Sequence, residues 1–158
     1  VMCWGSNEDG QIGDGKTGRD NNATSPVAVR GLRNVASLGN IADSSCAPLR
    51  DGTMRCWGAN DFGQTGHNES ETDDVTAPWE WLRDNDPAVA AFGNIVEAGC
   101  GWNFCCALHA AGNVSCAGST PIGGGGGFLG MSNRRSTTPI AAPGVQFTVP
   151  SPEEAAAE

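Results

Sequence analysis

The sequence begins with the stretch Val1-Met2-Cys3-Trp4-Gly5-Ser6-Asn7-Glu8-Asp9-Gly10-Gln11-Ile12-Gly13, which returns as Met54-Arg55-Cys56-Trp57-Gly58-Ala59-Asn60-Asp61-Phe62-Gly63-Gln64-Thr65-Gly66. Seven of the thirteen positions are identical, and the alignment needs no gap. Self-similarity at a fixed spacing is typical of folds assembled from copies of one supersecondary unit. The two stretches therefore determine how the rest of the sequence is interpreted.

A second alignment extends the repeat along the chain. Residues 32–58 match residues 92–118, with Gly39 on Gly99, Cys46 on Cys106 and Cys56 on Cys116. The chain is thus about three copies of a unit of about 50 to 60 residues, entered partway through a unit. We expect the repeats to occupy residues 1–149 and residues 150–158 to be a tail or linker rich in Pro, Ala and Glu.

Each unit has the pattern of short strands separated by glycine turns. Residues 35–38 and 95–98 are short apolar stretches, and residues 46–49 lead through Arg50-Asp51-Gly52 into residues 53–57. A three-residue loop that ends in glycine favours a β-hairpin. No segment shows a sustained helical period of apolar residues. Short strands at this spacing predict an all-β fold with one four-stranded sheet per unit, as in a blade of a β-propeller.

The repeated residues also carry a family resemblance. Cys-Trp-Gly-x-Asn-x-x-Gly-Gln-x-Gly, followed by Cys-Ala and Asp-Gly before the next Cys-Trp-Gly, resembles the RCC1-type repeat (regulator of chromosome condensation). The resemblance implies a propeller of seven blades, so three units are expected to be an excerpt of a longer chain. Trp4 and Trp57 are expected in the blade core, whereas the third copy departs from the pattern at Ala117.

The cysteine spacing predicts disulfides within hairpins. When residues are counted outward from the Arg50-Asp51-Gly52 loop, Cys46 faces Cys56, and Cys106 and Cys116 flank a second turn in the same way. Facing positions on antiparallel strands approach the separation that a disulfide requires. Buried reduced thiols are the alternative. Cys100 and Cys105 are extra to the repeat and are able to bridge each other, and Cys3 is expected to pair upstream of Val1.

The composition argues against some classes of binding partner and indicates a cellular location. A net charge of −9 argues against a nucleic-acid partner, because phosphate contacts need clustered Lys and Arg. No apolar run reaches the length of a membrane span. Seven cysteines and three N-glycosylation sequons predict an extracellular or cell-surface location with N-glycans; the sequons begin at Asn22, Asn68 and Asn113.

No motif indicates catalysis, a cofactor or a metal ion. The glycine run 123–127 lacks the Gly-Lys-Ser/Thr of a phosphate loop, and residues 14–22 lack the ligand spacing of a calcium loop. The two histidines are far apart, and no Cys-x-x-Cys pair suggests zinc. We therefore expect a protein that is not an enzyme.

The longest departure from the repeat lies between Gly66 and Phe92. Residues 69–86 contain seven acidic side chains with Trp79 and Trp81, so this loop is the predicted partner-binding surface. The alternative is that a tryptophan packs back on the blade while the acids are solvated.

Three functions follow from these observations. The first is a non-catalytic protein-interaction module of a secreted or cell-surface protein, whose partner is another protein or other blades of its own longer chain. The second is a structural component of an extracellular assembly. The third is guanine-nucleotide exchange on a small GTPase, which only the family resemblance implies.

Overall fold

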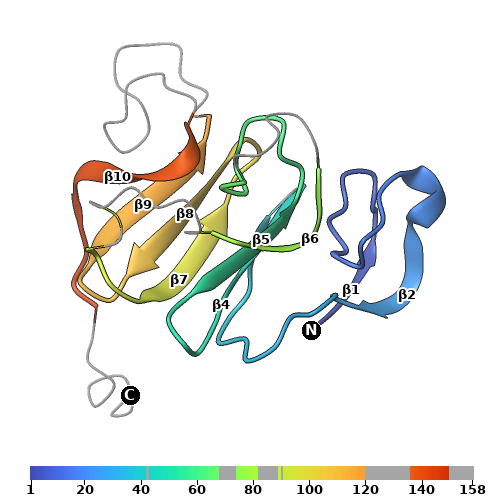
Figure 1. Ribbon diagram of the computed structural model, residues 1–158, viewed down its shortest axis with the longest axis horizontal. Coiled ribbons are helices and arrows are strands. Elements are labelled where there is room, and N and C mark those ends of the chain that lie inside the picture. The colour runs from blue at the N-terminus through green and yellow to red at the C-terminus, as the bar shows by residue number, and fades with distance from the viewer. Residues whose placement is uncertain (42, 68–73, 82–88, 90, 120–135, 150–158) are drawn as a thin grey trace.

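A computed structural model describes the chain except residues 42, 68–73, 82–88, 90, 120–135 and 150–158. The Gly123–Gly127 run and the expected tail therefore lie outside the described residues. Three antiparallel sheets follow one another across the molecule (Figure 1). Among the described residues, no helix is both long enough and apolar enough to cross a membrane.

The first sheet contains two strands, β1 (Met2–Gly5) and β2 (Ala23–Ala28), and a short 3-10 helix, η1 (Arg19–Asn21), precedes β2. The second sheet has the order β3 (Gly39–Ile41), β4 (Ser44–Pro48), β5 (Met54–Gly58) and β6 (Val75–Glu80). The third repeats that order with β7 (Ile95–Cys100), β8 (Phe104–His109), β9 (Asn113–Gly118) and β10 (Ser136–Gln146). The predicted four-stranded unit is thus confirmed for the second and third copies.

The hairpin register agrees with the count made from the sequence. Strands β4 and β5 pair Cys46 with Cys56, Ala47 with Arg55 and Pro48 with Met54. Strands β8 and β9 pair Cys106 with Cys116. One boundary differs, because residues 35–38 contribute only an isolated bridge from Val35 to Leu49 and the strand itself begins at Gly39.

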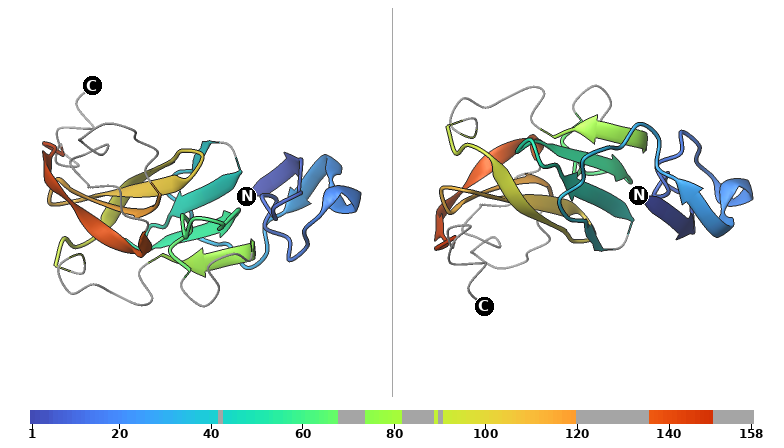
Figure 2. Two further views of the ribbon diagram at one scale, coloured as in Figure 1. Left: turned by 90° about the horizontal axis from the view of Figure 1, so that it is seen from above. Right: turned by 90° about the horizontal axis from the view of Figure 1, so that it is seen from below.

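Two apolar clusters hold adjacent sheets together, and the views from above and below show the sheets stacked side by side (Figure 2). Between the first and second sheets, Trp57 is fully buried with Val29, Ala47 and Val75, and its indole donates a hydrogen bond of 2.8 Å to the Gln11 carbonyl oxygen. The cluster between the second and third sheets contains these residues: Cys46, Met54, Cys56, Trp81, Ile95, Cys100, Cys105, Ala107 and Ala117.

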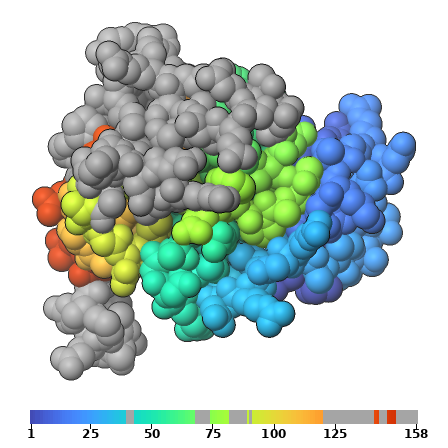
Figure 3. All heavy atoms as spheres, viewed as in Figure 1, coloured from blue at the N-terminus to red at the C-terminus, as the bar shows by residue number. Residues whose placement is uncertain are grey.

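Trp4 departs from its expected place in the core, because 63% of it is exposed. Its counterpart Trp57 is buried because the preceding copy supplies a turn, containing Gln11, that covers the indole. No described residue supplies such a turn beside Trp4. The space-filling view shows residues of the first sheet, in blue, at one side of the molecule (Figure 3).

A glycine marks the closest approach between the second and third sheets. A Cβ atom on Gly39 would lie 2.6 Å from the Ala98 carbonyl carbon, so the two backbones pack where no side chain fits. The equivalent residue of the third sheet, Gly99, has no described atom within 4 Å of such a Cβ. The Gly99 face of the third sheet is therefore uncovered by the described residues.

Candidate functional site

The repeated Asn-x-x-Gly-Gln-x-Gly motif forms one kind of turn at one end of the sheets. In the second copy, the buried Asn60 Oδ1 accepts hydrogen bonds from the Thr65 amide at 3.2 Å and the Thr65 hydroxyl at 2.6 Å. In the first copy, Asn7 Oδ1 accepts from the Ile12 amide at 3.0 Å. The asparagines therefore shape the turns, and the residues that follow them face outward.

The outward residues of these turns gather negative charge, and we call the set Glu8, Asp9, Asp43 and Asp61 the acidic end. Glu8 and Asp61 each follow a motif asparagine, whereas Asp43 lies between β3 and β4. The pKa of the Asp9 carboxyl is raised above its ordinary value, first because burial disfavours the charged form and then because Asp43, Asp61 and Glu8 repel it. Three separate turns thus bring carboxylates close to Asp9.

A cavity of about 440 Å³ adjoins the acidic end. It lies between the first and second sheets, and its lining residues include the exposed Trp4 together with Ser6, Gln11 and Asp43. An aromatic side chain beside a carboxylate offers apolar contact and charge to the same ligand. This part of the surface suits a segment that has both basic and apolar side chains.

The tryptophans predicted to bind a partner are placed differently. Trp81 is 0% exposed and belongs to the core cluster between the second and third sheets, so its assignment as a contact residue is corrected. Trp79 is half-buried in β6, opposite Cys56, and its ring stacks edge-on against His67 with centroids 4.1 Å apart. Trp79 lies in the outer strand β6, and Trp81 directly follows that strand, with its amide donating to the Met54 carbonyl oxygen at 3.0 Å. Residues 69–73 and 82–86 lie outside the described residues.

An exposed tryptophan and part of the acidic end were not predicted from the sequence. Trp102 is 75% exposed in the turn between β7 and β8, which is the counterpart of the turn that contains Asp43. The acidic end was detectable in part, since Glu8 and Asp61 occupy the same position in the repeat. Asp43 and Trp102 have no such repeated signal, and only the folded structure brings their turns to one end.

Both predicted hairpin disulfides are present in the structure, and Cys100 and Cys105, whose pairing the sequence left open, are bridged as well. Cys46 pairs with Cys56, Cys106 with Cys116 and Cys100 with Cys105. Cys3 forms no disulfide with another described cysteine, and burial raises the pKa of its thiol; its expected pairing upstream of Val1 stays a prediction.

The sequons differ in their surroundings. Asn22 is exposed, and its Oδ1 accepts a hydrogen bond of 2.7 Å from the Asn7 amide. Asn113 is half-buried at the start of β9, and Ser115 of the same sequon is fully buried. Asn68 lies outside the described residues. Among the two that are described, Asn22 offers the more accessible side chain for a glycan.

A buried serine–histidine pair has a structural arrangement. His109 and Ser115 are both 0% exposed, with 2.8 Å between Nε2 and the hydroxyl oxygen. Since Nδ1–H donates to the Gly93 carbonyl oxygen at 2.9 Å, Nε2 accepts from Ser115. Burial lowers the pKa of His109, so the ring is held neutral between β8 and β9. The described residues bury both side chains.

Comparisons with known proteins agree with the fold. The profile described as "Regulator of chromosome condensation (RCC1) repeat" matches residues 42–64. A curated relative, "Protein RCC2 homolog" of Xenopus laevis, is 33% identical over 112 residues, which are 70% of this chain and 19% of the relative.

Solved structures give the same result. Prp20p from Saccharomyces cerevisiae, described with its binding to Gsp1p and histones, matches 93% of this chain with a TM-score of 0.74 at 22% identity. Human WBSCR16 matches 89% of the chain with a TM-score of 0.68 at 25% identity. The chain spans 34% and 32% of those two proteins, so the likeness is to about one third of each fold.

Proposed function

Because this chain is built from RCC1-type repeats, we propose that it is a non-catalytic protein-interaction module whose acidic end binds a basic segment of a partner protein. The observation behind the proposal is the convergence of Asp9, Asp43 and Asp61 from three turns beside the cavity at Trp4. The Cys46–Cys56 disulfide joins β4 and β5, and it gives a rigid support to the turns that contain Asp43 and Asp61. A rigid surface loses little conformational entropy when it binds.

Charge supports a basic partner. The whole chain has a net charge of −9, and the pKa of Asp9 in the acidic end is raised first by burial and then by the neighbouring carboxylates. A bound Lys or Arg side chain would favour ionised Asp9, so binding should release protons near the raised pKa. Complementary charge mainly accelerates association and selects the partner. The likeness to Prp20p, which is described with its binding to Gsp1p and histones, supports a protein partner.

We propose that the module is located at the cell surface or outside the cell. Three disulfides in one short chain are typical of oxidising compartments, and the exposed Asn22 sequon is compatible with a glycan. A structural component of an extracellular assembly would need the same disulfides. It differs from the proposed binding module because it would not need a soluble partner.

Nucleotide exchange on a small GTPase is the second candidate. Its support is the likeness to Prp20p, which is described as binding Gsp1p. The two candidates differ in what they do to a GTPase loaded with fluorescent GDP: an exchange factor accelerates nucleotide release, and a binding module does not.

The test measures binding of a fluorescent Lys/Arg-rich peptide by anisotropy, with an acidic peptide of equal length as the negative ligand. The variant D43N/D61N removes two charges from the acidic end, and D20N/E97Q removes two exposed charges elsewhere. At about 0.2–1 kcal/mol for each exposed pair, the first variant should bind roughly 2- to 30-fold more weakly. Equal affinity of both variants would refute the assigned site, and acceleration of GDP release would favour the exchange factor.

A further inference from the structure

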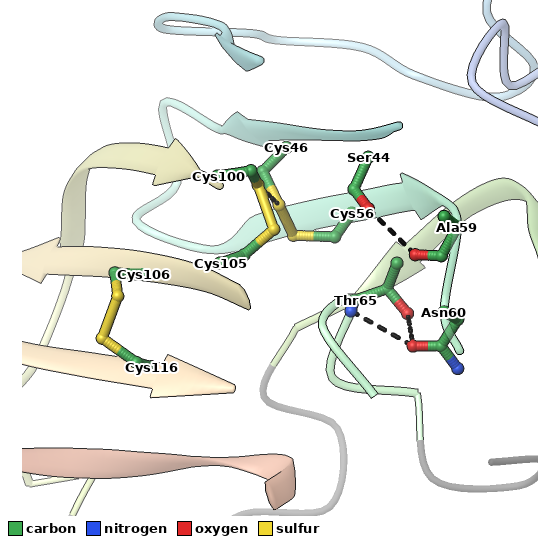
Figure 4. The surroundings of a disulfide bond; sticks show 10 residues. All are labelled: Ser44, Cys46, Cys56, Ala59, Asn60, Thr65, Cys100, Cys105, Cys106 and Cys116. Carbon is green, nitrogen blue, oxygen red and sulfur yellow. Dashed lines mark hydrogen bonds between the residues drawn. A yellow bond between two sulfur atoms is a disulfide. The ribbon is translucent and has the colours of Figure 1, made fainter. Parts of the chain in front are cut away.

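Two disulfides face each other between the second and third sheets (Figure 4). One joins Cys46 and Cys56 across β4 and β5, and the other joins Cys100 and Cys105 across β7 and β8. The Sγ atom of Cys100 lies 3.3 Å from the Sγ atom of Cys46, although the two are not bonded and are 54 residues apart. The Sγ atoms of Cys46, Cys100 and Cys105 all lie within 4.8 Å of one another.

The close approach results from the glycine contact between these sheets. Gly39 pairs with Cys46 in the register of β3 and β4, and Ala98 packs against Gly39 two residues before Cys100. The missing Cβ of Gly39 therefore lets β7 approach the strand pair that contains Cys46. The contact brings a half-cystine of one sheet next to a half-cystine of its neighbour.

We propose that these four cysteines form a thiol–disulfide exchange site, which a dithiol reductant converts from two bridges within sheets to one bridge between sheets, Cys46–Cys100. The reductant first transfers two electrons to the Cys100–Cys105 bridge and becomes a disulfide itself. The Cys100 thiolate then attacks Cys46 Sγ, a Cys46–Cys100 bond forms, and the Cys46–Cys56 bond breaks. Cys56 leaves as a thiolate and takes up a proton, so the second step transfers no net electrons.

The Cys100–Cys105 bridge is the one that a reductant reaches first. Cys100 is 4% exposed, compared with 0–1% for Cys46, Cys56 and Cys105, and it borders the turn in which Trp102 is 75% exposed. Cys100 and Cys105 are only five positions apart in the sequence, so local opening of that turn would leave the pairing of β8 with β9 in place.

The surroundings favour sulfur–sulfur bonds over a metal–thiolate centre. Met54, Trp81 and Ile95 pack around the cysteines in the same cluster. Four thiolates on a divalent cation would place a net negative charge among these apolar side chains, whereas a disulfide is neutral. The same apolar environment disfavours a free thiolate, so exchange should be slow near neutral pH and should accelerate as pH rises.

The test uses Cys105→Ser in a Cys3→Ser background, which leaves Cys100 as a thiol next to the intact Cys46–Cys56 bridge. The protein is incubated at several pH values, quenched with acid, alkylated and mapped by mass spectrometry. We expect peptides linked through Cys46–Cys100 together with alkylated Cys56. Their rate of formation should rise about tenfold per pH unit below the pKa of the thiol.

The matched control is Cys116→Ser in the same background, which frees Cys106 instead. Cys106 is outside the group of sulfurs around Cys46, so the other two bridges should remain intact. If Cys105→Ser fails to fold, the Cys3→Ser protein is treated with a limiting amount of dithiothreitol instead. Reduction of Cys100–Cys105 should then lead to the same Cys46–Cys100 disulfide.

Recovery of Cys100 only as the alkylated thiol, with Cys46–Cys56 intact in both experiments, would overturn the proposal. Protection of all four thiols by stoichiometric Zn²⁺ after complete reduction would also overturn it, in favour of a metal site.

Discussion

Gly39 and Gly99 occupy the same position in adjacent repeats, and they should respond in opposite ways to the same substitution. In Gly39→Ala, the new Cβ would meet the carbonyl oxygen and carbon of Ala98, which are backbone atoms with little freedom to move. Overpacking of this kind lowers the free energy of unfolding by about 1–3 kcal/mol. In Gly99→Ala, the Cβ meets no described atom within 4 Å. A reduced entropy of the unfolded chain should then stabilise the protein by about 0.4–1 kcal/mol.

The two variants should therefore differ by about 1.4–4 kcal/mol in their free energy of unfolding. Urea denaturation followed by tryptophan fluorescence measures this difference. With a slope of about 2 kcal/mol per M, the midpoints should be about 0.7–2 M apart, with Gly39→Ala lower. Equal midpoints would refute the conclusion that the second and third sheets meet through the Gly39 backbone.

Three further outcomes are expected. Trp81→Ala should destabilise the fold by about 3–5 kcal/mol, whereas Trp102→Ala should change stability by less than about 0.5 kcal/mol, and similar thermal shifts would contradict their placement. Asn60→Ala should destabilise by about 1–3 kcal/mol and expose the Thr65 amide to hydrogen exchange, since a buried acceptor is lost; an unchanged exchange rate would exclude that role. Because burial lowers the folded-state pKa of His109, the unfolded state takes up a proton first as pH falls below about 6.5. Stability should then decline by up to about 1.4 kcal/mol per pH unit, and His109→Gln should reduce the decline between pH 7.5 and 5.5.

The hairpins were predictable because their determinants are local. Counting outward from the Arg50-Asp51-Gly52 loop gives the Cys46–Cys56 register, and the same count applies to Cys106 and Cys116. Strand alternation then fixes which side chains meet. The position of the strand before β4 was less predictable, because the apolar residues 35–38 look more strand-like than Gly39–Ile41.

The site depended on contacts between repeats, and these have no local signal. The two tryptophans near the acidic stretch resemble an exposed pair in the sequence, yet Trp81 fills the space between two sheets. Asp9 and Asp61 lie in two copies of the repeated turn, but Asp43 lies outside that motif, and its proximity to Asp9 is visible only in the folded structure. Trp4 repeats Trp57 by sequence, but burial of either indole requires a turn from a neighbouring unit.

The buried tryptophans also limit how freely these repeats can be exchanged. Trp57 faces the preceding unit, and its counterpart in the next repeat is Ala117, which lies in one cluster with Trp81. The aromatic side chain at the second junction is thus supplied by the outer end of the earlier repeat and not by the inner hairpin of the later one. A shuffled chain that placed the second repeat after a copy of itself would bring Trp57 and Trp81 to one junction and overfill it. A chain that placed the third repeat directly after the first would have neither indole there. Each repeat is therefore matched to its neighbour, and their order along the chain is part of what the sequence encodes.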